Sequence, residues 1–505
     1  MAQEEGVSGD DAVVTPGLAG IPAAGVGDAA VAVYGDAGDG EVGGGGSGLG
    51  ALGVDLHLDL SGSRRRRGLT DAIREAVRSG RLAPGTRLPS SRVLAVDLGV
   101  ARNTVADAYA DLVAEGWLTA RQGAGTRVAE RAVPKPVVRG AGHRREPGRP
   151  RYSLLPGSPD LAAFPRAEWL KAARRAFTAA PSDALGYGDP RGRIELRAAL
   201  AGYLARVRGV RADPEHILVS TGFSHSLRVL GELLHARGVR ALAVETYGLP
   251  PHWAILENAG LTTTPLPFDT HGTRVSDLPS DAGALLLTPS HQFPMGVALH
   301  SERRAAIVDW ARRTGGLILE DDYDGEFRYD RQPVGALQDL DPDHVVYLGT
   351  ASKSLAPGLR LAWLVLPPAL TAEAARLSGA QSTSVLEQLT LAEFIDSGAY
   401  DRHVRASRLR YRRRRDDLVA AVAAHAPDVH VTGIAAGLHA VLLLPPGTED
   451  SVIHAAAWQS LALYGLSRFR HTTIPTSPDA LVVGYGTPSD HTWPPALDAL
   501  CRVLP

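Results

Sequence analysis

Cysteine is almost missing from this sequence, because Cys501 is the only one among 505 residues. A single cysteine excludes an internal disulfide and a clustered-cysteine metal site, and we expect no bound metal. No apolar run reaches the roughly 18 residues that span a bilayer, so no membrane partner is expected. The N-terminus also lacks the basic segment of a secretion signal, which favours a cytoplasmic protein.

Lysine and arginine are absent from residues 1–60, although acidic residues occur there. Large apolar side chains are scarce in residues 1–55, which are rich in Gly, Ala and Asp and include a GGGGSG run at 43–48. This composition buries too little apolar surface to offset the entropy of ordering, so a disordered tail is predicted. A glycine-rich phosphate loop is the alternative, but no strand or helix is expected on either side of it.

Positive charge is concentrated in the next part of the chain. Residues 64–151 hold 19 Lys and Arg against eight Asp and Glu, a balance that suits nucleic acid. Residues 56–130 alternate helical patterns with turns, and a first helix is indicated by apolar residues on one face. These residues are Leu69, Ile73, Ala76 and Val77. Ser90 or Ser91 can cap a short second helix. A third helix is expected over about 102–115, and two strands follow within 117–128. Together these elements predict a winged helix-turn-helix.

The second helix of the helix-turn-helix motif is here the helix expected over about 102–115. In such a motif this helix reads base edges, while arginines and hydroxyls hold the DNA backbone. The candidate DNA-binding residues are Arg92, Arg102, Asn103 and Thr104 at helix starts, and Gly123 and Gly125 in the wing. The alternative is a solvated basic face on a small helical domain. The ordered succession of turns and helices favours DNA binding over that alternative.

A long run of this segment resembles the winged-helix reader of the GntR superfamily. It begins at Gly80 and is GRLAPGTRLPSSRVLAVDLGVARNTVADAYADLVAEGWLTARQGAGTRV. The resemblance implies that Arg92, Arg102, Thr104 and the wing contact operator DNA.

Proline and arginine recur through residues 131–151, which predicts an extended basic linker. Residues 152–505 then alternate helical stretches with short apolar runs. The expected strands are 217–220, 241–244, 284–287, 317–319, 345–348 and 362–366. This pattern predicts an α/β fold with a mainly parallel, doubly wound sheet, followed by a smaller C-terminal α/β part from about residue 400.

Lys353 follows the apolar strand 345–348, at a strand end where α/β folds bind ligands. A lysine whose pKa is lowered by burial or by cations can form a Schiff base. Thr350, Ser352 and Arg360 lie close in sequence and could hold a phosphate. By spacing alone, a surface lysine beside a structural arginine is the favoured explanation of this run.

The end of a second predicted strand also indicates a cofactor site. Asp321 and Tyr323 alternate after the run that starts at Gly316. Pyridoxal 5′-phosphate (PLP) needs a carboxylate on its pyridine nitrogen and a donor for its phenolate oxygen, and these residues fit both roles. The adjacent acids could instead bind Mg²⁺, but a PLP site also explains the lysine run.

Residues 152–505 resemble fold-type I aminotransferases, and the whole chain resembles the MocR/GabR subfamily of regulators. The resemblance is carried by LPGSPDLAAFP, LGYGDPRGRIELRAALAGYL, TGFSHSL, TPSHQFPMG, LEDDYDGEFRY and GTASKSLAPGLRLAW. It implies an aldimine on Lys353, with Asp321 on the pyridine nitrogen and Tyr323 on the phenolate oxygen. The residues implied for the phosphate are Arg360, Ser352, the backbone at Phe223 and Ser224, and Tyr187 from the partner subunit of a homodimer. His291 and Gln292 line the cofactor side in the same pattern.

Two positions depart from the family pattern. Leu249 stands where a tyrosine often stacks on the cofactor ring, with Tyr247 two residues earlier. Thr487 stands where an arginine grips the substrate carboxylate in aminotransferases. Arg468 and Arg470 lie near in sequence, but the sequence does not show which way they face.

The leading hypothesis is a DNA-binding transcription regulator whose aminotransferase-like domain senses PLP, an amine or an amino acid through Lys353. The alternative is a working PLP-dependent aminotransferase with an appended DNA-binding domain. A third possibility is a regulator that has lost its cofactor. The missing carboxylate arginine argues against efficient turnover, while a half-transamination stays open. The effector and the operator are not given by the sequence.

Overall fold

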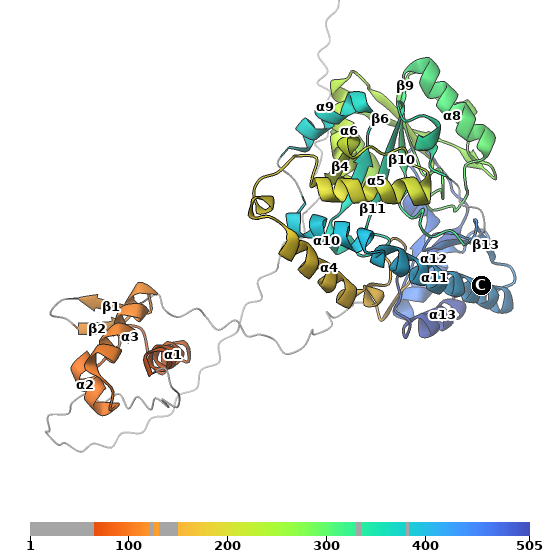
Figure 1. Cartoon of the computed structure of the whole chain (residues 1–505). Coiled ribbons are helices and arrows are strands. Elements are labelled where there is room, and N and C mark those ends of the chain that lie inside the picture. Colours follow the sequence, from red (N-terminus) through yellow and green to blue (C-terminus); the bar gives the residue numbers. More distant parts are fainter. Residues whose placement is uncertain (1–64, 122–124, 131–149, 330–334, 380–382) are drawn as a thin grey trace, which may run out of the picture. The chain divides into compact units, whose positions relative to one another are not determined.

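The computed structural model describes residues 65–121, 125–130, 150–329, 335–379 and 383–505 (Figure 1). The chain divides into two compact units, residues 1–142 and 143–505. The predicted tail, most of the predicted linker and Gly123 lie outside the described residues. No helix in the described part is long and apolar enough to cross a membrane.

The N-terminal unit is a three-helix winged fold. Its elements are α1 (Arg65–Arg78), α2 (Ser91–Asp97), α3 (Arg102–Ala114), β1 (Leu118–Arg121) and β2 (Gly125–Val128). The four apolar residues predicted to share a face of the first helix are all buried in the core of this unit. Ser90 caps α2, because its hydroxyl accepts a hydrogen bond from the Val93 amide. The helix-turn-helix predicted from the sequence is therefore present.

The wing is an antiparallel pair, with Leu118 opposite Val128. The segment before α2 adds a further edge to it, since Thr86 and Leu88 exchange backbone hydrogen bonds with β2 at 2.9 Å. Gly125 begins β2 with φ of +80°, a conformation that favours glycine. The backbone hydrogen bonds of Thr86 and Leu88 thus attach the hairpin to the segment that precedes α2.

A seven-stranded sheet forms the centre of the second unit, in the order β4-β12-β11-β10-β9-β5-β6. Its strands are β4 (Ile217–Ser220), β5 (Ala241–Glu245), β6 (Thr262–Leu266), β9 (Ala282–Leu287), β10 (Leu317–Asp321), β11 (Val345–Thr350) and β12 (Ala362–Val365). Only β12 runs antiparallel to its neighbours. The predicted mainly parallel α/β fold is thus confirmed.

Helices cover both faces of this sheet, because its strands alternate apolar side chains between the two sides. Val346 and Leu348 of β11 pack in the cluster that holds α6, α7 and α9. Val345 and Tyr347 of the same strand pack on the opposite side, against α8 and α5. The helices are α4 (Arg166–Ala179), α5 (Ile194–Arg208), α6 (Phe223–Ala236), α7 (Pro250–Asn258), α8 (Ser301–Thr314), α9 (Pro368–Ser378) and α10 (Val385–Asp396). Figure 1 shows α5 lying across the strands rather than along them.

The C-terminal part is built on an antiparallel sheet in the order β13-β14-β17-β16. Its main elements are α11 (Ala399–His425), β13 (His430–Thr432), β14 (Ala440–Leu443), α12 (Glu449–Trp458), β16 (Tyr464–Gly465), β17 (Ala480–Val483) and α13 (Trp493–Cys501). β3 (Tyr152–Ser153) joins this part by pairing with β15 (Leu461–Ala462), and a small hairpin is formed by β7 (Phe268–Asp269) and β8 (Gly272–Thr273).

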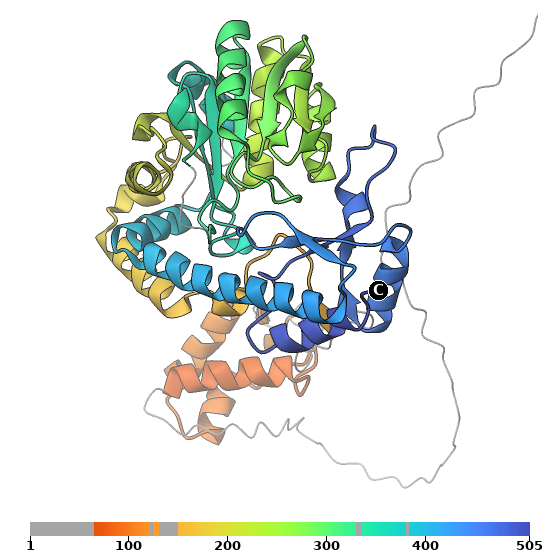
Figure 2. The same ribbon diagram turned by 90° about the vertical axis from the view of Figure 1, so that its right-hand side faces the viewer.

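The long helix α11 connects the two parts of this unit (Figure 2). Tyr400 near its start packs in the core of the large sheet, and Leu418 packs in the core of the small one. Between them, buried Arg414 pairs with Asp160 at 2.9 Å and with Asp490 at 2.7 Å. It also donates to the carbonyls of Tyr485 and Pro488.

Replacing Arg414 with Met should destabilise this unit, because it leaves the buried carboxylate of Asp160 without its cation. The expected loss is about 3–5 kcal/mol of unfolding free energy, measured by chemical denaturation. Arg412→Gln is the matched control, since Arg412 is exposed on the same helix and should change stability by less than about 0.5 kcal/mol. Equal denaturation midpoints for both variants would contradict the role given to Arg414.

Candidate functional site

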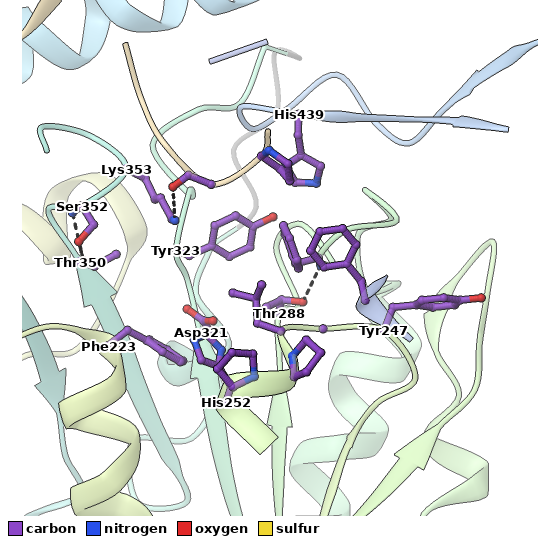
Figure 3. Close-up of a pocket in the computed structure, with 18 of the residues that line it drawn as sticks. Phe223, Tyr247, His252, Thr288, Asp321, Tyr323, Thr350, Ser352, Lys353 and His439 are labelled. Carbon is purple, nitrogen blue, oxygen red and sulfur yellow. Dashed lines mark hydrogen bonds between the residues drawn. The ribbon is translucent and has the colours of Figure 1, made fainter. Parts of the chain in front are cut away.

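A cavity of about 950 Å³ opens at the C-terminal ends of the strands of the large sheet (Figure 3). Eight of the ten residues predicted to bind a cofactor line it. They are Phe223, Ser224, Asp321, Tyr323, Thr350, Ser352, Lys353 and Arg360. They come from four separate stretches of the chain, which the parallel strands bring to one edge.

Lys353 lies in the turn after β11 and points into the cavity (Figure 3). Its Nζ donates a hydrogen bond of 2.5 Å to the carbonyl of Gly157. Burial lowers the pKa of this amine below its usual value, although the carboxylates of Asp321 and Asp324 oppose that effect. A lowered pKa increases the neutral, nucleophilic fraction of the amine.

Asp321 is the last residue of β10 and carries an unusual oxygen atom. Among the residues that the structure describes, its buried Oδ1 has no hydrogen-bond partner. Burial raises the pKa of this carboxyl well above its usual range, with the charge of Lys353 acting in the opposite direction. Buried oxygens are rarely left unpaired, so Asp321 fits a ligand that brings a nitrogen donor or a cation into the cavity.

An anion-binding cradle lies at the start of α6. Gly222 precedes this helix with φ of +114°, and the free amides of the first turn begin at Phe223. The guanidinium of Arg360 packs directly on Gly222, where an added Cβ would lie 2.9 Å from Nη2. The hydroxyls of Thr350 and Ser352 form a hydrogen bond of 2.9 Å beside it. A phosphate group fits this combination of amides, guanidinium and hydroxyls.

Tyr323 lies beyond the end of β10, in a bend, so it does not continue the strand as expected from the alternation. It still lines the cavity, and burial raises the pKa of its phenol well above the usual value. Its hydroxyl is 3.0 Å from Nδ1 of His291, which also lies 2.7 Å from Asp324. His291 is therefore behind Tyr323 rather than on the cavity wall. Gly437 makes room for this pair, because a Cβ there would lie 2.4 Å from the His291 ring.

Tyr187 is fully exposed in the single chain and does not line the cavity. Thr487, at the position of the missing arginine, donates to the carbonyls of Leu155 at 2.6 Å and Ser158 at 3.2 Å. Its hydroxyl thus holds the 155–158 segment that forms part of the cavity wall. Tyr247 packs edge-on against Phe268 and extends away from Asp321 (Figure 3).

Three further lining residues were not predicted. His252 packs against Phe223 at 4.6 Å between ring centroids, and burial lowers its pKa to about 4. His439 is fully buried, which lowers its pKa to about 3. Arg468 lies at the cavity 4.3 Å above the ring of Tyr464, whereas Arg470 does not line the cavity. None of these stands in a motif with fixed spacing to Lys353, so only the fold brings them there.

The candidate DNA contacts lie on the winged fold as expected from their sequence positions. Arg92 is in the first turn of α2, and Arg102, Asn103 and Thr104 form the first turn of α3. The first three are exposed and Thr104 is half-buried. Arg87, which was not predicted, extends along the wing, where its Nε would lie 3.1 Å from a Cβ at Gly125.

Comparison with known proteins matches both units. Residues 66–128 match the family model of bacterial regulatory proteins of the gntR family, and residues 157–482 match that of aminotransferase class I and II. An archaeal alanine:glyoxylate aminotransferase superposes with a TM-score of 0.63 at 23% identity, covering 70% of this chain and 90% of that one. Pyrococcus horikoshii kynurenine aminotransferase gives 0.62 at 22% identity, with the same coverage. These structures establish the fold alone.

Curated relatives match over most of the chain. The HTH-type pyridoxine biosynthesis transcriptional regulator PdxR of Corynebacterium glutamicum is 34% identical over 84% of this chain and 92% of its own length. The probable rhizopine catabolism regulatory protein MocR of Rhizobium meliloti is 33% identical over 80% and 86%. The chain therefore belongs to the MocR-type HTH transcriptional regulators, which join a GntR-family winged helix to an aminotransferase class I and II domain.

Proposed function

We propose that this regulator binds PLP in the cavity at Lys353 and that the occupied cavity changes how the protein binds operator DNA. The observation that carries the proposal is the unpaired Oδ1 of Asp321, in the same cavity as the amine of Lys353, whose pKa is lowered by burial. When bound, PLP supplies an aldehyde that reacts with amines and a ring that withdraws electrons.

Different residues of the cavity would bind different groups of the cofactor. Lys353 would hold the aldehyde carbon, and Asp321 would accept a hydrogen bond from the pyridine nitrogen. Tyr323, oriented by His291, would donate to the phenolate oxygen. The α6 amides at Phe223 and Ser224 would bind the phosphate together with the side chains of Arg360, Ser352 and Thr350.

The chemistry at Thr487 supports PLP itself as the signal. The threonine hydroxyl is engaged by two backbone carbonyls and offers no positive charge to an amino-acid carboxylate. The relative PdxR is named a regulator of pyridoxine biosynthesis, which agrees with a ligand of this class. An amine or amino acid that reacts with bound PLP is the alternative effector, and titration of PLP-loaded protein with such amines distinguishes the two.

A homodimer is part of the proposal. Large apolar side chains are exposed along consecutive segments from α4 to the first residue of α5. They are Leu170, Phe177, Leu185, Tyr187 and Ile194. Exposed apolar side chains of this kind are typical of an interface between subunits. Tyr187 would then reach the phosphate in the partner's cavity.

An active aminotransferase with an appended DNA-binding domain is the second candidate. The buried amine of Lys353 and the carboxyl of Asp321 would support a half-transamination. Steady multiple turnover with an amino acid and a 2-oxo acid would favour this function. The engaged Thr487 hydroxyl leads us to expect little turnover.

The coupling is tested by DNA-binding titrations of the full chain with and without PLP. Operator affinity of the wild type should change by roughly 5-fold or more, the usual size of allosteric coupling. Lys353→Ala should remove this response, because the aldehyde has no amine to hold it. Lys171→Ala is the matched control, since Lys171 is an exposed lysine on α4. If PLP leaves DNA binding unchanged in the wild type, the proposal is wrong.

Asp321→Asn should have opposite effects on cofactor affinity and on stability. Loss of a charged hydrogen bond should weaken PLP binding by about 10- to 100-fold, measured by visible absorbance. The PLP-free variant should be at least as stable as the wild type in thermal unfolding, because it no longer buries a carboxylate with an unpaired oxygen.

The stability difference should also depend on pH. Folding raises the pKa of the Asp321 carboxyl. This carboxyl therefore destabilises the folded protein at pH values above its unfolded pKa of about 3.9, and has no such effect below it. The advantage of Asp321→Asn should therefore be present at neutral pH and vanish in acid below that value. A PLP-free variant that is less stable than the wild type at neutral pH would show that Asp321 has a structural partner instead.

A further inference from the structure

A second cavity, of about 430 Å³, lies elsewhere on the C-terminal unit. Its walls are the last turns of α5, the 325–328 segment after β10 and the first turns of α11. It shares no lining residue with the cofactor cavity. The exposed apolar residue of α5, Ile194, is at the other end of that helix, so this cavity is separate from the proposed dimer contact.

Arginine dominates the walls of this cavity. Five arginines line it, against the two carboxylic acids Glu326 and Asp401. The five are Arg206, Arg208, Arg328, Arg405 and Arg408. Arg206 pairs with Asp401 at 2.7 Å, and Arg208 pairs with Asp322 at 2.6 Å.

The positive charge that remains is concentrated on α11. Arg408 donates through Nε and Nη2 to the backbone carbonyl of Glu326, at 2.9 and 2.7 Å, and a carbonyl does not cancel its charge. Arg405 lies three residues earlier, on the same face of the helix. Within the described ranges, no ion pair includes Arg405 or Arg408. The helix therefore presents two uncompensated guanidinium groups to one cavity.

Glu326 offsets this charge only in part. Its carboxyl is buried, which raises its pKa to about 7, and the nearby charge of Asp322 acts in the same direction. The hydroxyl of Tyr400 donates to it at 3.3 Å. At neutral pH a substantial fraction of this carboxyl is protonated and uncharged, so the cavity favours anions.

We propose that this cavity is a second ligand site, for a small dianion such as inorganic phosphate or the phosphate of a small phosphate ester. Arginine pairs suit such ligands, because each planar guanidinium can donate two hydrogen bonds to neighbouring phosphate oxygens. The site also has a structural connection to the cofactor cavity. Arg208 of its wall holds Asp322, the residue that directly follows Asp321.

The test uses the full chain saturated with PLP, so that the cradle at Arg360 is already filled. Inorganic phosphate, glycerol phosphate and sulfate are titrated by calorimetry at constant ionic strength. We expect saturable binding with one site per chain. Arg405→Gln combined with Arg408→Gln should weaken it by roughly tenfold or more, which is the usual loss for charged hydrogen bonds.

The matched control is Arg412→Gln combined with Arg413→Gln, which removes two exposed arginines farther along α11 that do not line the cavity. This variant should bind phosphate as the wild type does. Glu326→Gln should tighten sulfate binding at pH 8, where the wild-type carboxyl is charged. An unchanged visible spectrum of bound PLP confirms that each variant is folded.

Three outcomes would overturn the proposal. The first is no saturable binding of any of the three anions to the PLP-loaded wild type. The second is equal loss of binding in the test and control variants, which shows only that net charge matters. The third is loss of affinity for duplex DNA in the test variant without any binding of small anions. If PLP fails to bind in the first place, the proposed cofactor site is wrong, and the PLP-free protein still permits the comparison of the two arginine pairs.

Discussion

The buried Oδ1 of Asp321, which has no hydrogen-bond partner among the described residues, is the constraint on which the proposed cofactor site depends. A buried carboxyl without a partner costs free energy, so the surrounding structure has to hold it in place. β10 does so by pairing in parallel with both β9 and β11, which leaves the end of the strand no freedom to turn outward. Lys353 follows β11, the adjacent strand, so the same pairing sets the separation of the amine and the acid.

The two acids at this strand end have opposite surroundings. Asp321 lines the cavity, and its Oδ1 has no hydrogen-bond partner within the described residues, whereas Asp322 accepts from Arg208 at 2.6 Å and from the hydroxyl of Tyr347 at 2.7 Å. The contacts of Asp322 hold the backbone at this strand end in place. Asp321 is thereby kept in position for a ligand. Such a combination is typical of a preorganised site, in which supporting residues hold a strained group ready.

Much of this could be predicted from local patterns. Six of the seven strands of the large sheet were expected to within about two residues, because short apolar runs bounded by turns are strong signals, whereas the edge strand β6 was not predicted. The winged helix was predicted for the same reason, through its apolar helical face and the cap at Ser90. Lys353 also stands out in composition, since only three lysines occur in the sequence.

Contacts between distant segments could not be predicted. Phe223 and His252 come together across the cavity only because α6 and α7 pack on the same face of the sheet. The basic cavity combines α5, the 325–328 segment and α11, which no spacing rule connects. Tyr323 was expected to continue its strand, but β10 ends at Asp321, where the chain bends toward His291. Sequence periodicity describes one element at a time, and these features are properties of several.

The contacts of Thr487 fit the proposed sensor better than an efficient aminotransferase. An aminotransferase has to bind and release two substrates in succession, so it gains from a cation that grips each carboxylate. Here the equivalent hydroxyl is occupied with the carbonyls of Leu155 and Ser158. The same 155–158 segment includes Gly157, whose carbonyl accepts from Nζ of Lys353. If Nζ held a ligand instead, the carbonyl of Gly157 would lose this hydrogen bond, and the segment that contains Gly157 is the one that Thr487 holds to the C-terminal sheet. A sensor requires a ligand that distinguishes two arrangements of such a segment.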